Sequence, residues 1–201
     1  MTKEFIEDIE PFFGYRAISY VDVGAYDGKV FLKFAKSGLN IAEAHLIEPN
    51  PESYAILKKS VNEFRSKLKV SLYRTALGSK HGKILMRASG SMTTVVEQAP
   101  ENPGHDEAYF DVSVSTLNEL FHAVAIDRIS ILKLDVEGFE ENVLSGGDEL
   151  FSKSLVDVIY VEVGFSTENR QQCYYRRVDD YLTAHGYRIF RIYEQKNEWI
   201  D

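Results

Sequence analysis

Residues 19–28 read SYVDVGAYDG, and this stretch decides the fold. Its first five residues form a short apolar run, which is typical of a buried β-strand. The turn that follows contains Gly24 and Gly28, which allow a tight bend and close packing of helix against strand. A helix is expected from Gly28 to residue 37, stopped by Gly38. The stretch therefore predicts the strand–turn–helix unit of an α/β sheet.

The same alternation of apolar runs and helical stretches continues along the chain. Further core strands are expected at residues 44–47, 70–73, 130–134, 156–163 and 187–193, with flanking strands at residues 83–87 and 110–114. Further helical stretches are expected at residues 51–67, 116–124, 139–144 and 170–185, after an N-terminal helical segment at residues 1–18. The alternation predicts one α/β domain over residues 19–201, with a mostly parallel, twisted sheet and helices on both faces.

Local signals refine this pattern. Asn50 before Pro51 is a good helix cap, and Thr116 followed by Glu119 has the spacing of a capping box. Residues 75–78 (TALG) are expected to turn away from the third core strand. Residues 88–106 read as a long polar loop with prolines and glycines, and loops of that length are often functional or mobile. We expect this loop and residues 166–171 to set the choice of substrate.

Composition excludes several classes of protein. The 201 residues carry a formal net charge of −8, and such a field repels phosphate backbones, so no nucleic-acid partner is expected. No stretch approaches the ~20 apolar residues of a membrane helix, and the acidic N-terminus is unlike a secretion signal. Cys173 is the only cysteine, so no internal disulfide can form, and we expect it to be a packing residue. These features favour a cytoplasmic protein that acts on small or neutral substrates.

An acidic residue follows the second strand at the distance that nucleotide-binding units use. Glu48 lies about 20 residues after Gly28, where a carboxylate accepts hydrogen bonds from both ribose hydroxyls. The alternative is a solvated glutamate at a helix start, where the helix dipole favours a negative charge. Together with the glycine turn, Glu48 predicts the binding of a nucleoside.

The turn lacks the features of a pyrophosphate site. It departs from G-x-G-x-x-G because position 26 is tyrosine. Asp22 and Asp27 add negative charge at the helix start, which disfavours a pyrophosphate and suits a cationic ligand. S-adenosylmethionine carries a sulfonium and an ammonium group, so we expect it as the cofactor in preference to NAD.

Three further acids lie where the active cleft of such a sheet should open. Asp135 and Glu137 follow the fourth core strand in the segment KLDVEGF, and Glu162 lies at the end of the fifth. Unpaired acids are costly to bury, so acids at strand ends indicate a functional site. A structural interpretation carries equal weight. It has Asp135 capping the next helix, Glu137 paired with Lys133, and Glu162 solvated.

Residues from about 19 to 199 also resemble the FkbM family of methyltransferases. DVGAYDG is similar to the family's first cofactor motif, LIEPNPESY to its second, and TALG to the segment beside the adenine. ILKLDVEGFEENVLSGG resembles the family's most distinctive stretch, and GYRIFRIYEQKNEW its late segment. The resemblance implies a Rossmann-like methyltransferase fold, S-adenosylmethionine as the cofactor, and O-methylation of a hydroxyl on a sugar, glycan or natural product.

The resemblance implies roles for single positions as well. The methionine part of the cofactor would lie against Asp22, Gly24, Ala25 and Gly28. The ribose would be held by Glu48, with Pro49 and Asn50 beside it. The adenine would be bordered by Ala76 and Leu77, and the cofactor would be approached by Ser91. The methyl group and the acceptor would be faced by Asp135 and Glu137.

The chain departs from the family pattern at its C-terminal end. The family fold normally ends with an antiparallel seventh strand inserted between the fifth and the sixth. After the sixth expected strand and the few residues that flank it, only residues 197–201 remain in this sequence. Five residues are too few to form another strand across the sheet. We therefore expect this last strand to be missing or truncated, or the sixth strand to pair directly with the fifth. A partner chain, such as a second copy in a homo-oligomer, would cover the exposed edge.

Methyl transfer to a hydroxyl requires a base, and we expect Asp135 or Glu137 in this role, with Glu162 third. A divalent metal on these carboxylates would act similarly, but the five histidines are scattered singly and support no metal site. Two alternatives stay open. An NAD-dependent oxidoreductase would use Tyr-x-x-x-Lys, a spacing that Tyr54 and Lys58 have. A non-catalytic nucleoside-binding module would keep the fold without turnover.

Overall fold

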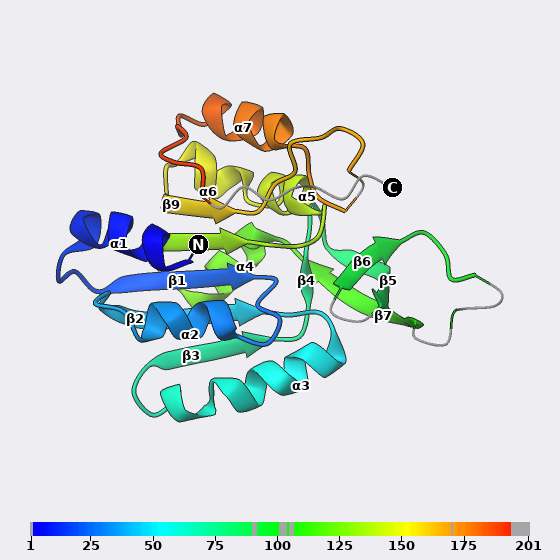
Figure 1. Cartoon of the computed structure of the whole chain (residues 1–201), viewed down its shortest axis with the longest axis horizontal. Coiled ribbons are helices and arrows are strands. Elements are labelled where there is room, and N and C mark those ends of the chain that lie inside the picture. The colour runs from blue at the N-terminus through cyan, green and yellow to red at the C-terminus, as the bar shows by residue number, and fades with distance from the viewer. Residues whose placement is uncertain (1, 90–91, 101–103, 105–106, 170, 194–201) are drawn as a thin grey trace.

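The computed structural model describes residues 2–89, 92–100, 104, 107–169 and 171–193, which form two sheets (Figure 1). The larger sheet has the strand order β3-β2-β1-β8-β9, and all of its strand pairs are parallel. Its strands are β1 (Ile18–Val23), β2 (Ile41–Ile47), β3 (Lys69–Tyr73), β8 (Ile129–Leu134) and β9 (Val156–Val161). The expected mainly parallel, Rossmann-like sheet is thus confirmed.

Helices cover both faces of the large sheet. They are α1 (Thr2–Phe13), α2 (Lys29–Ala35), α3 (Pro51–Ser60), α4 (Leu117–Val124), α5 (Glu140–Ser145), α6 (Asp148–Ser152) and α7 (Tyr175–Ala184). One apolar core joins α1, α2 and α3 to the sheet, and a second joins α4 to α7 to its other face. Successive side chains of β1 point to opposite faces of the sheet, so Tyr20 packs in the first core and Val21 in the second. None of the described helices is long and apolar enough to cross a membrane.

The smaller sheet stands beyond the carboxyl ends of the large sheet's strands (Figure 1). Its strands, in spatial order, are β4 (Ala76–Leu77), β7 (Glu107–Ser115), β5 (Gly82–Ser89) and β6 (Met92–Val96). It has an apolar cluster of its own that includes Met86, Val112 and Val114. The small sheet is therefore an addition placed where parallel α/β sheets bind their ligands.

One expectation for this region is confirmed and another is wrong. Residues 75–78 turn away from β3 as expected, and Ala76 and Leu77 then pair in parallel with β7 of the small sheet. The expected loop at residues 88–106 contains β6, which pairs antiparallel with β5. Residues 93–96 (TTVV) are all β-branched and favour a strand, and this preference outweighs the nearby glycines and prolines on which the loop prediction rested.

Some helix boundaries differ as well. α3 ends at Ser60, not at residue 67, and a short 3₁₀ helix, η1 (Asn62–Phe64), follows it. Ser60, Val61 and Asn62 are three weak helix formers in a row, which explains the early end. α7 begins only at Tyr175, residue 170 lies outside the described residues, and α6 was not expected. By contrast, the capping box is confirmed, with the Thr116 hydroxyl accepting from the Glu119 N–H at 3.1 Å.

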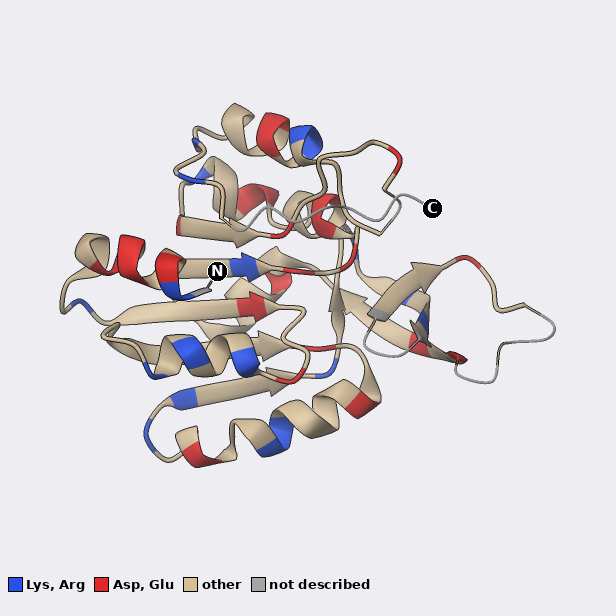
Figure 2. Ribbon diagram, in the orientation of Figure 1, with Lys and Arg blue, Asp and Glu red and all other residues tan. Residues whose placement is uncertain are grey.

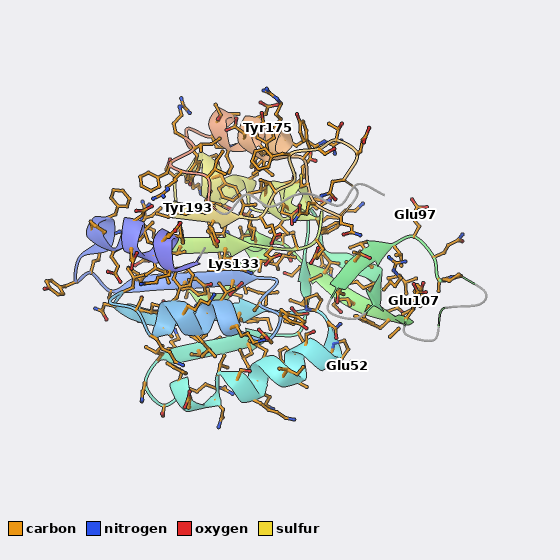
Figure 3. The ribbon with its side chains drawn as sticks, viewed as in Figure 1. Glu52, Glu97, Glu107, Lys133, Tyr175 and Tyr193 are labelled. Atoms are coloured by element: carbon orange, nitrogen blue, oxygen red, sulfur yellow. The ribbon has the colours of Figure 1, made fainter. Side chains whose placement is uncertain are left out.

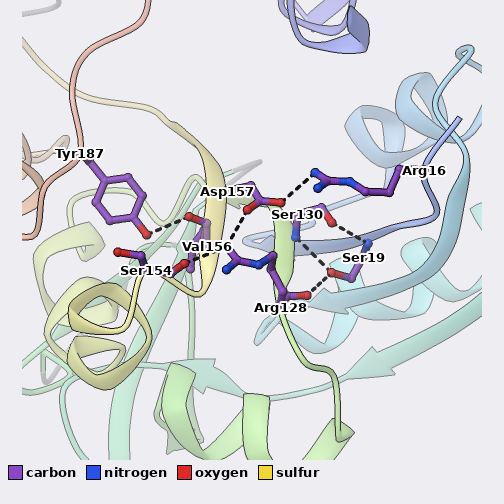
Figure 4. A network of polar contacts seen from close by, with 8 residues as sticks. All are labelled: Arg16, Ser19, Arg128, Ser130, Ser154, Val156, Asp157 and Tyr187. Atoms are coloured by element: carbon purple, nitrogen blue, oxygen red, sulfur yellow. Dashed lines mark hydrogen bonds and ion pairs between the residues drawn. The ribbon is translucent and has the colours of Figure 1, made fainter. Parts of the chain in front are cut away.

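The sixth strand expected at residues 187–193 is not formed, and β9 is the edge of the sheet among the described residues. Side chains hold this segment instead. The Tyr187 hydroxyl donates to the Val156 carbonyl at the start of β9 at 2.8 Å (Figure 4). The Tyr193 hydroxyl donates to Asp8 of α1 at 2.7 Å, and its ring packs against Phe5. The two tyrosines therefore anchor a strand-like sequence that forms no strand ladder, while Ile189, Phe190 and Ile192 between them are exposed.

Polar contacts tie together the amino ends of the central strands (Figure 4). Asp157 of β9 pairs with Arg16 at 3.1 Å and with Arg128 at 2.7 Å. The Ser130 N–H donates to the Ser19 hydroxyl at 3.1 Å, and this links β8 to β1. These groups serve the protein's own structure, so the candidates for ligand binding are at the opposite, carboxyl ends.

Candidate active site

A cavity of about 260 Å³ lies at the carboxyl ends of β1, β2 and β8, against the small sheet. It brings together most of the residues expected to act at the site: Gly24, Glu48, Pro49, Ala76, Leu77, Asp135 and Glu137. The small sheet contributes residues that the sequence analysis did not single out: Ile84, Met86, Thr93 and Val95. The cavity thus has an acidic wall at the strand tips and a mainly apolar wall opposite. Figure 2 shows acidic positions in the loops that follow the strands of the large sheet.

The remaining expected residues are placed differently. Asp22, Ala25 and Asn50 are buried and do not line the cavity. Gly28 is buried beneath the turn, and Glu162 follows β9 next to Asp135. Ser91 lies outside the described residues, so its role stays a prediction.

A larger groove of about 450 Å³ lies elsewhere, between α1, α7 and β9, and most of its lining is apolar. None of the expected site residues that the structure describes lines it. The chemistry of the smaller cavity, not the size of the groove, decides which is the candidate site.

The glycine turn after β1 touches the tip of β8. Gly24 has a φ of +81°, and a Cβ atom there would lie 1.8 Å from the Asp135 carbonyl oxygen. Gly28 has a φ of +80°, and its Cβ would lie 2.8 Å from the Leu57 side chain on α3. Both positions therefore require glycine, and the first brings the expected cofactor turn into contact with the candidate catalytic segment.

Gly24→Ala should lower the free energy of unfolding by roughly 2–5 kcal/mol, because strain at positive φ adds to overlap with β8. Urea unfolding measures this change. Gly82→Ala is the matched control, since a Cβ at Gly82 meets nothing within 4 Å, and it should change stability by less than about 0.5 kcal/mol. Equal stability of the two variants would contradict the contact.

Glu48 is held rigidly at the end of β2. It is only 5% exposed, and its two carboxylate oxygens accept hydrogen bonds from the Tyr26 and Asn50 N–H groups, each at 2.8 Å. Burial raises the pKa of Glu48, and the two backbone hydrogen bonds oppose that rise. Each oxygen keeps further acceptor capacity, as binding of two ribose hydroxyls requires. The solvated alternative for Glu48 is therefore wrong.

Asn50 connects the two sheets. Its side-chain oxygen caps α3 by accepting from Glu52 N–H at 2.9 Å and Ser53 N–H at 3.3 Å. Its amide nitrogen donates to the Thr93 hydroxyl on β6 at 2.9 Å. The helix-cap prediction is confirmed, and the contact with Thr93 fixes the small sheet beside Glu48.

The charges expected to be free at the turn are paired. Asp22 is fully buried, accepts from the Tyr20 hydroxyl at 2.9 Å and lies 3.0 Å from the Lys133 ammonium. Burial raises the pKa of Asp22, and Lys133 opposes that rise. Asp27 pairs with Lys29 at 2.6 Å. Asp22 and Asp27 therefore favour a cationic ligand less than the sequence indicates, because each is paired with a lysine.

The acids after β8 and β9 influence one another. Glu137 has a φ of +50°, an uncommon conformation for a residue with a side chain, and burial together with Asp135 and Glu140 raises its pKa. Burial and the hydrogen-bonded neighbour Asp135 raise the pKa of Glu162 to about 7. Gln172 also donates to Glu162 at 2.6 Å. Such a group changes its protonation state at physiological pH.

The structural interpretation holds for Glu162, which is exposed as that interpretation expects, but not for Asp135 or Glu137. Lys133 pairs with Asp22 and with Asp135, the latter at 3.3 Å, and not with Glu137. The residue that organises the start of α5 is Glu140, which accepts from the Val136 N–H at 3.0 Å and the Gly138 N–H at 3.4 Å. Asp135 is therefore not a helix cap, and its side chain is 34% exposed at the cavity.

The alternatives for cofactor and metal find little support in the geometry. Tyr54 and Lys58 lie on α3, and neither lines the cavity. In the part of the chain that the structure describes, no group of three or more His, Cys, Asp and Glu side chains has the arrangement of a metal site.

Comparison with known proteins places these features in a family. The model of the methyltransferase FkbM domain matches residues 22–189, which is more than half of the chain. Among solved structures, a methyltransferase FkbM from Methylobacillus flagellatus KT aligns with a TM-score of 0.56 and 14% identity. The match covers 84% of this chain but only 37% of that one.

A conserved hypothetical protein from Streptococcus pyogenes aligns with a TM-score of 0.43 and 13% identity, over 78% of this chain and 69% of that one. No curated protein matches the sequence. At such identities a structural likeness supports the fold alone. The family match instead spans the glycine turn, Glu48 and the acids after β8 and β9. The chain therefore belongs to the FkbM family of methyltransferases.

Proposed function

We propose that this protein transfers a methyl group from S-adenosylmethionine to a hydroxyl of a sugar, glycan or other natural product. The observation that carries the proposal is a single cavity lined by the buried Glu48 and by Asp135 and Glu137. Glu48 suits a ribose, and the two other acids suit an acceptor hydroxyl. The family supplies the reaction class, and the resemblance of the sequence motifs supplies the class of acceptor.

The residues around the cavity fit a nucleoside cofactor. Glu48 offers two fixed carboxylate oxygens, and Leu77, Met86 and Val95 offer an apolar surface suited to a flat base. When bound, S-adenosylmethionine supplies an activated methyl group. With Asp22 and Asp27 paired to lysines, the negative charge that favours a sulfonium comes from the acids after β2, β8 and β9.

A hydroxyl becomes a good nucleophile only as its proton is removed. Asp135 lines the cavity, so its carboxylate can accept this proton while the acceptor is held in place. Glu162 is hydrogen-bonded to Asp135, so the two carboxyl groups can share the proton that Asp135 accepts. Glu137 faces the same cavity and would orient the acceptor, while Phe139 and Met86 exclude water from it.

The rate of methyl transfer should rise about tenfold per pH unit up to pH 7 and level off above it. The reason is that the pKa of Glu162 is about 7, so below that pH Glu162 is protonated and donates a hydrogen bond to Asp135, which occupies the carboxylate that must accept the proton of the hydroxyl. A profile of kcat/KM against pH measures this, and Glu162→Gln should displace the acid limb. Glu149→Gln is the control, because Glu149 is paired with Lys153 on the surface. A native profile that is flat between about pH 5 and pH 9 would refute the role of the pair.

Two measurements test the proposed function itself. Calorimetry with S-adenosylmethionine and with NAD should show binding of the first alone. Mass spectrometry of a panel of hydroxylated sugars and natural products, incubated with a methyl-labelled donor, should then reveal a methylated product. Binding of NAD instead would favour an oxidoreductase. Binding of S-adenosylmethionine without any product would favour a non-catalytic module.

The remaining expectations belong to this proposal. We place the reaction in the cytoplasm, where Cys173, a buried free thiol, stays reduced. The proposed partner is a small-molecule or glycan acceptor, and neither nucleic acid nor a membrane takes part. A second copy that covers the edge of β9 is a further expectation, and light scattering of the purified protein tests it.

A further inference from the structure

We infer that Lys133 is a positioning residue that couples the cofactor turn to the candidate catalytic carboxylate. The inference rests on the proposed function of the cavity. Lys133 lies on β8 near the centre of the large sheet (Figure 3) and is only 4% exposed. Its ammonium group donates to the Gly24 carbonyl at 3.0 Å and lies 3.0 Å from Asp22 and 3.3 Å from Asp135.

The sheet itself builds this arrangement. Lys133 is the register partner of Asp22 in the parallel pairing of β1 with β8, so the two side chains lie on the same face. Asp135 lies two residues beyond Lys133 and projects to that face as well. The ammonium group of Lys133 is thereby placed between Asp22 on β1 and Asp135, which follows β8.

The ammonium group of Lys133 is surrounded by oxygen atoms. It donates a hydrogen bond to the Gly24 carbonyl and forms ion pairs with the carboxylates of Asp22 and Asp135. A buried lysine is costly unless it is paired in this way. Burial opposes the charge of Lys133, but the two carboxylates outweigh burial and raise its pKa, so Lys133 is charged at neutral pH.

The contacts of Lys133 reach both functional parts of the cavity. At Gly24 it holds the carbonyl group that opens the glycine turn, and at Asp135 it holds the side chain that lines the cavity. Its charge also lowers the pKa of acids that it does not contact, namely Glu48, Glu137 and Glu162. Loss of Lys133 would therefore loosen the turn and shift the titration of the acids together.

A purely structural role would be to neutralise the buried Asp22 and nothing more. The two roles differ in what happens when Asp22 is neutral as well. In Asp22→Asn/Lys133→Met both buried charges are removed together, and the Tyr20 hydroxyl keeps an acceptor. A structural role then predicts that the amides of the turn exchange as in the native protein and that the acids keep their native pKa values. A positioning role predicts that both are still disturbed, because Asp135 and Gly24 have lost their cation.

The experiment compares Lys133→Met and the double variant with the native protein in the absence of cofactor. Carbon-13 NMR follows the titration of the Glu162 carboxyl, and hydrogen exchange follows the amides of residues 24–28. The described groups that face this carboxyl or its hydrogen-bonded partner are Tyr20, Asp22, Lys133, Asp135, Glu137, Glu140 and Gln172. We expect the Glu162 midpoint to rise by about one pH unit or more and the amides of the turn to exchange at least about tenfold faster.

Lys29→Met is the matched control, because it removes an exposed lysine from the same turn and should leave the Glu162 midpoint unchanged. If Lys133→Met does not fold, the charge-balanced double variant still gives both readouts. An unchanged Glu162 midpoint, or unchanged exchange at residues 24–28, in a folded variant overturns the inference. Calorimetry of the native protein with S-adenosylhomocysteine is a separate arm, and absence of binding there overturns the proposed function while leaving the Lys133 measurements valid.

Discussion

Asp135→Asn should lower the turnover number by about 10²–10⁴-fold and leave the affinity for S-adenosylmethionine nearly unchanged. Asparagine keeps the shape of the side chain and its place at the cavity but cannot accept a proton from a hydroxyl. Glu137→Gln should act in the same direction, because Glu137 lines the same cavity and has a raised pKa. The split between kcat and cofactor affinity distinguishes a catalytic carboxylate from one that holds the cofactor.

Single-turnover methyl transfer and calorimetry measure the two quantities on the same preparation. Asp127→Asn is a suitable control, since Asp127 is exposed and lies in the loop before β8, at the amino end of the sheet. Full activity in both Asp135→Asn and Glu137→Gln would remove these residues from the reaction. A large loss of cofactor affinity would reassign them to cofactor binding.

Glu48→Ala should show the reverse pattern, with the affinity for S-adenosylmethionine lowered about 10–100-fold. The estimate corresponds to the loss of hydrogen bonds from ribose hydroxyls to a charged acceptor. The Tyr26 and Asn50 N–H groups, which both donate to Glu48, would lose their partner as well. The free energy of unfolding should therefore fall by roughly 1–3 kcal/mol.

Calorimetry with S-adenosylmethionine and with S-adenosylhomocysteine measures the affinity, and urea unfolding measures the stability. Glu52→Ala is the matched control, because Glu52 is an exposed acid in the first turn of α3, close to Glu48 in the sequence. Its affinity should equal that of the native protein. Unchanged affinity in Glu48→Ala would exclude the ribose role, and the cavity would then need another interpretation.

Sequence reasoning succeeded where local pattern and burial agree. Buried parallel strands are nearly continuous apolar runs, so β1 and β8 were recognisable, and the glycine turn marked the connection to α2. It failed at residues 187–193 (YRIFRIY), where the terminal tyrosines Tyr187 and Tyr193 anchor a segment that has no strand ladder. It also failed at β6, because the pairing with β5 is a tertiary property that glycines and prolines nearby obscured.

The same limit applies to the site. Glu48 and the acids after β8 and β9 were found because strand ends can be read from sequence. The sequence indicates only Glu137 as a partner of Lys133, whereas the contact that reveals the place of Lys133 is with Gly24, 109 residues away in the chain. Thr93 was missed for a similar reason, since its partner Asn50 is 43 residues distant. Such pairs become visible only when the register of the sheets is known.

The separate apolar cluster of the small sheet has an evolutionary consequence. Substitutions in the small sheet, for example at Ile84, can reshape the outer wall of the cavity, while the cores that stabilise the large sheet keep their packing. A lineage built on this plan can exchange the molecules that it modifies and retain its donor chemistry. Diversification of acceptors and inheritance of the reaction are thus assigned to two different parts of one short polypeptide.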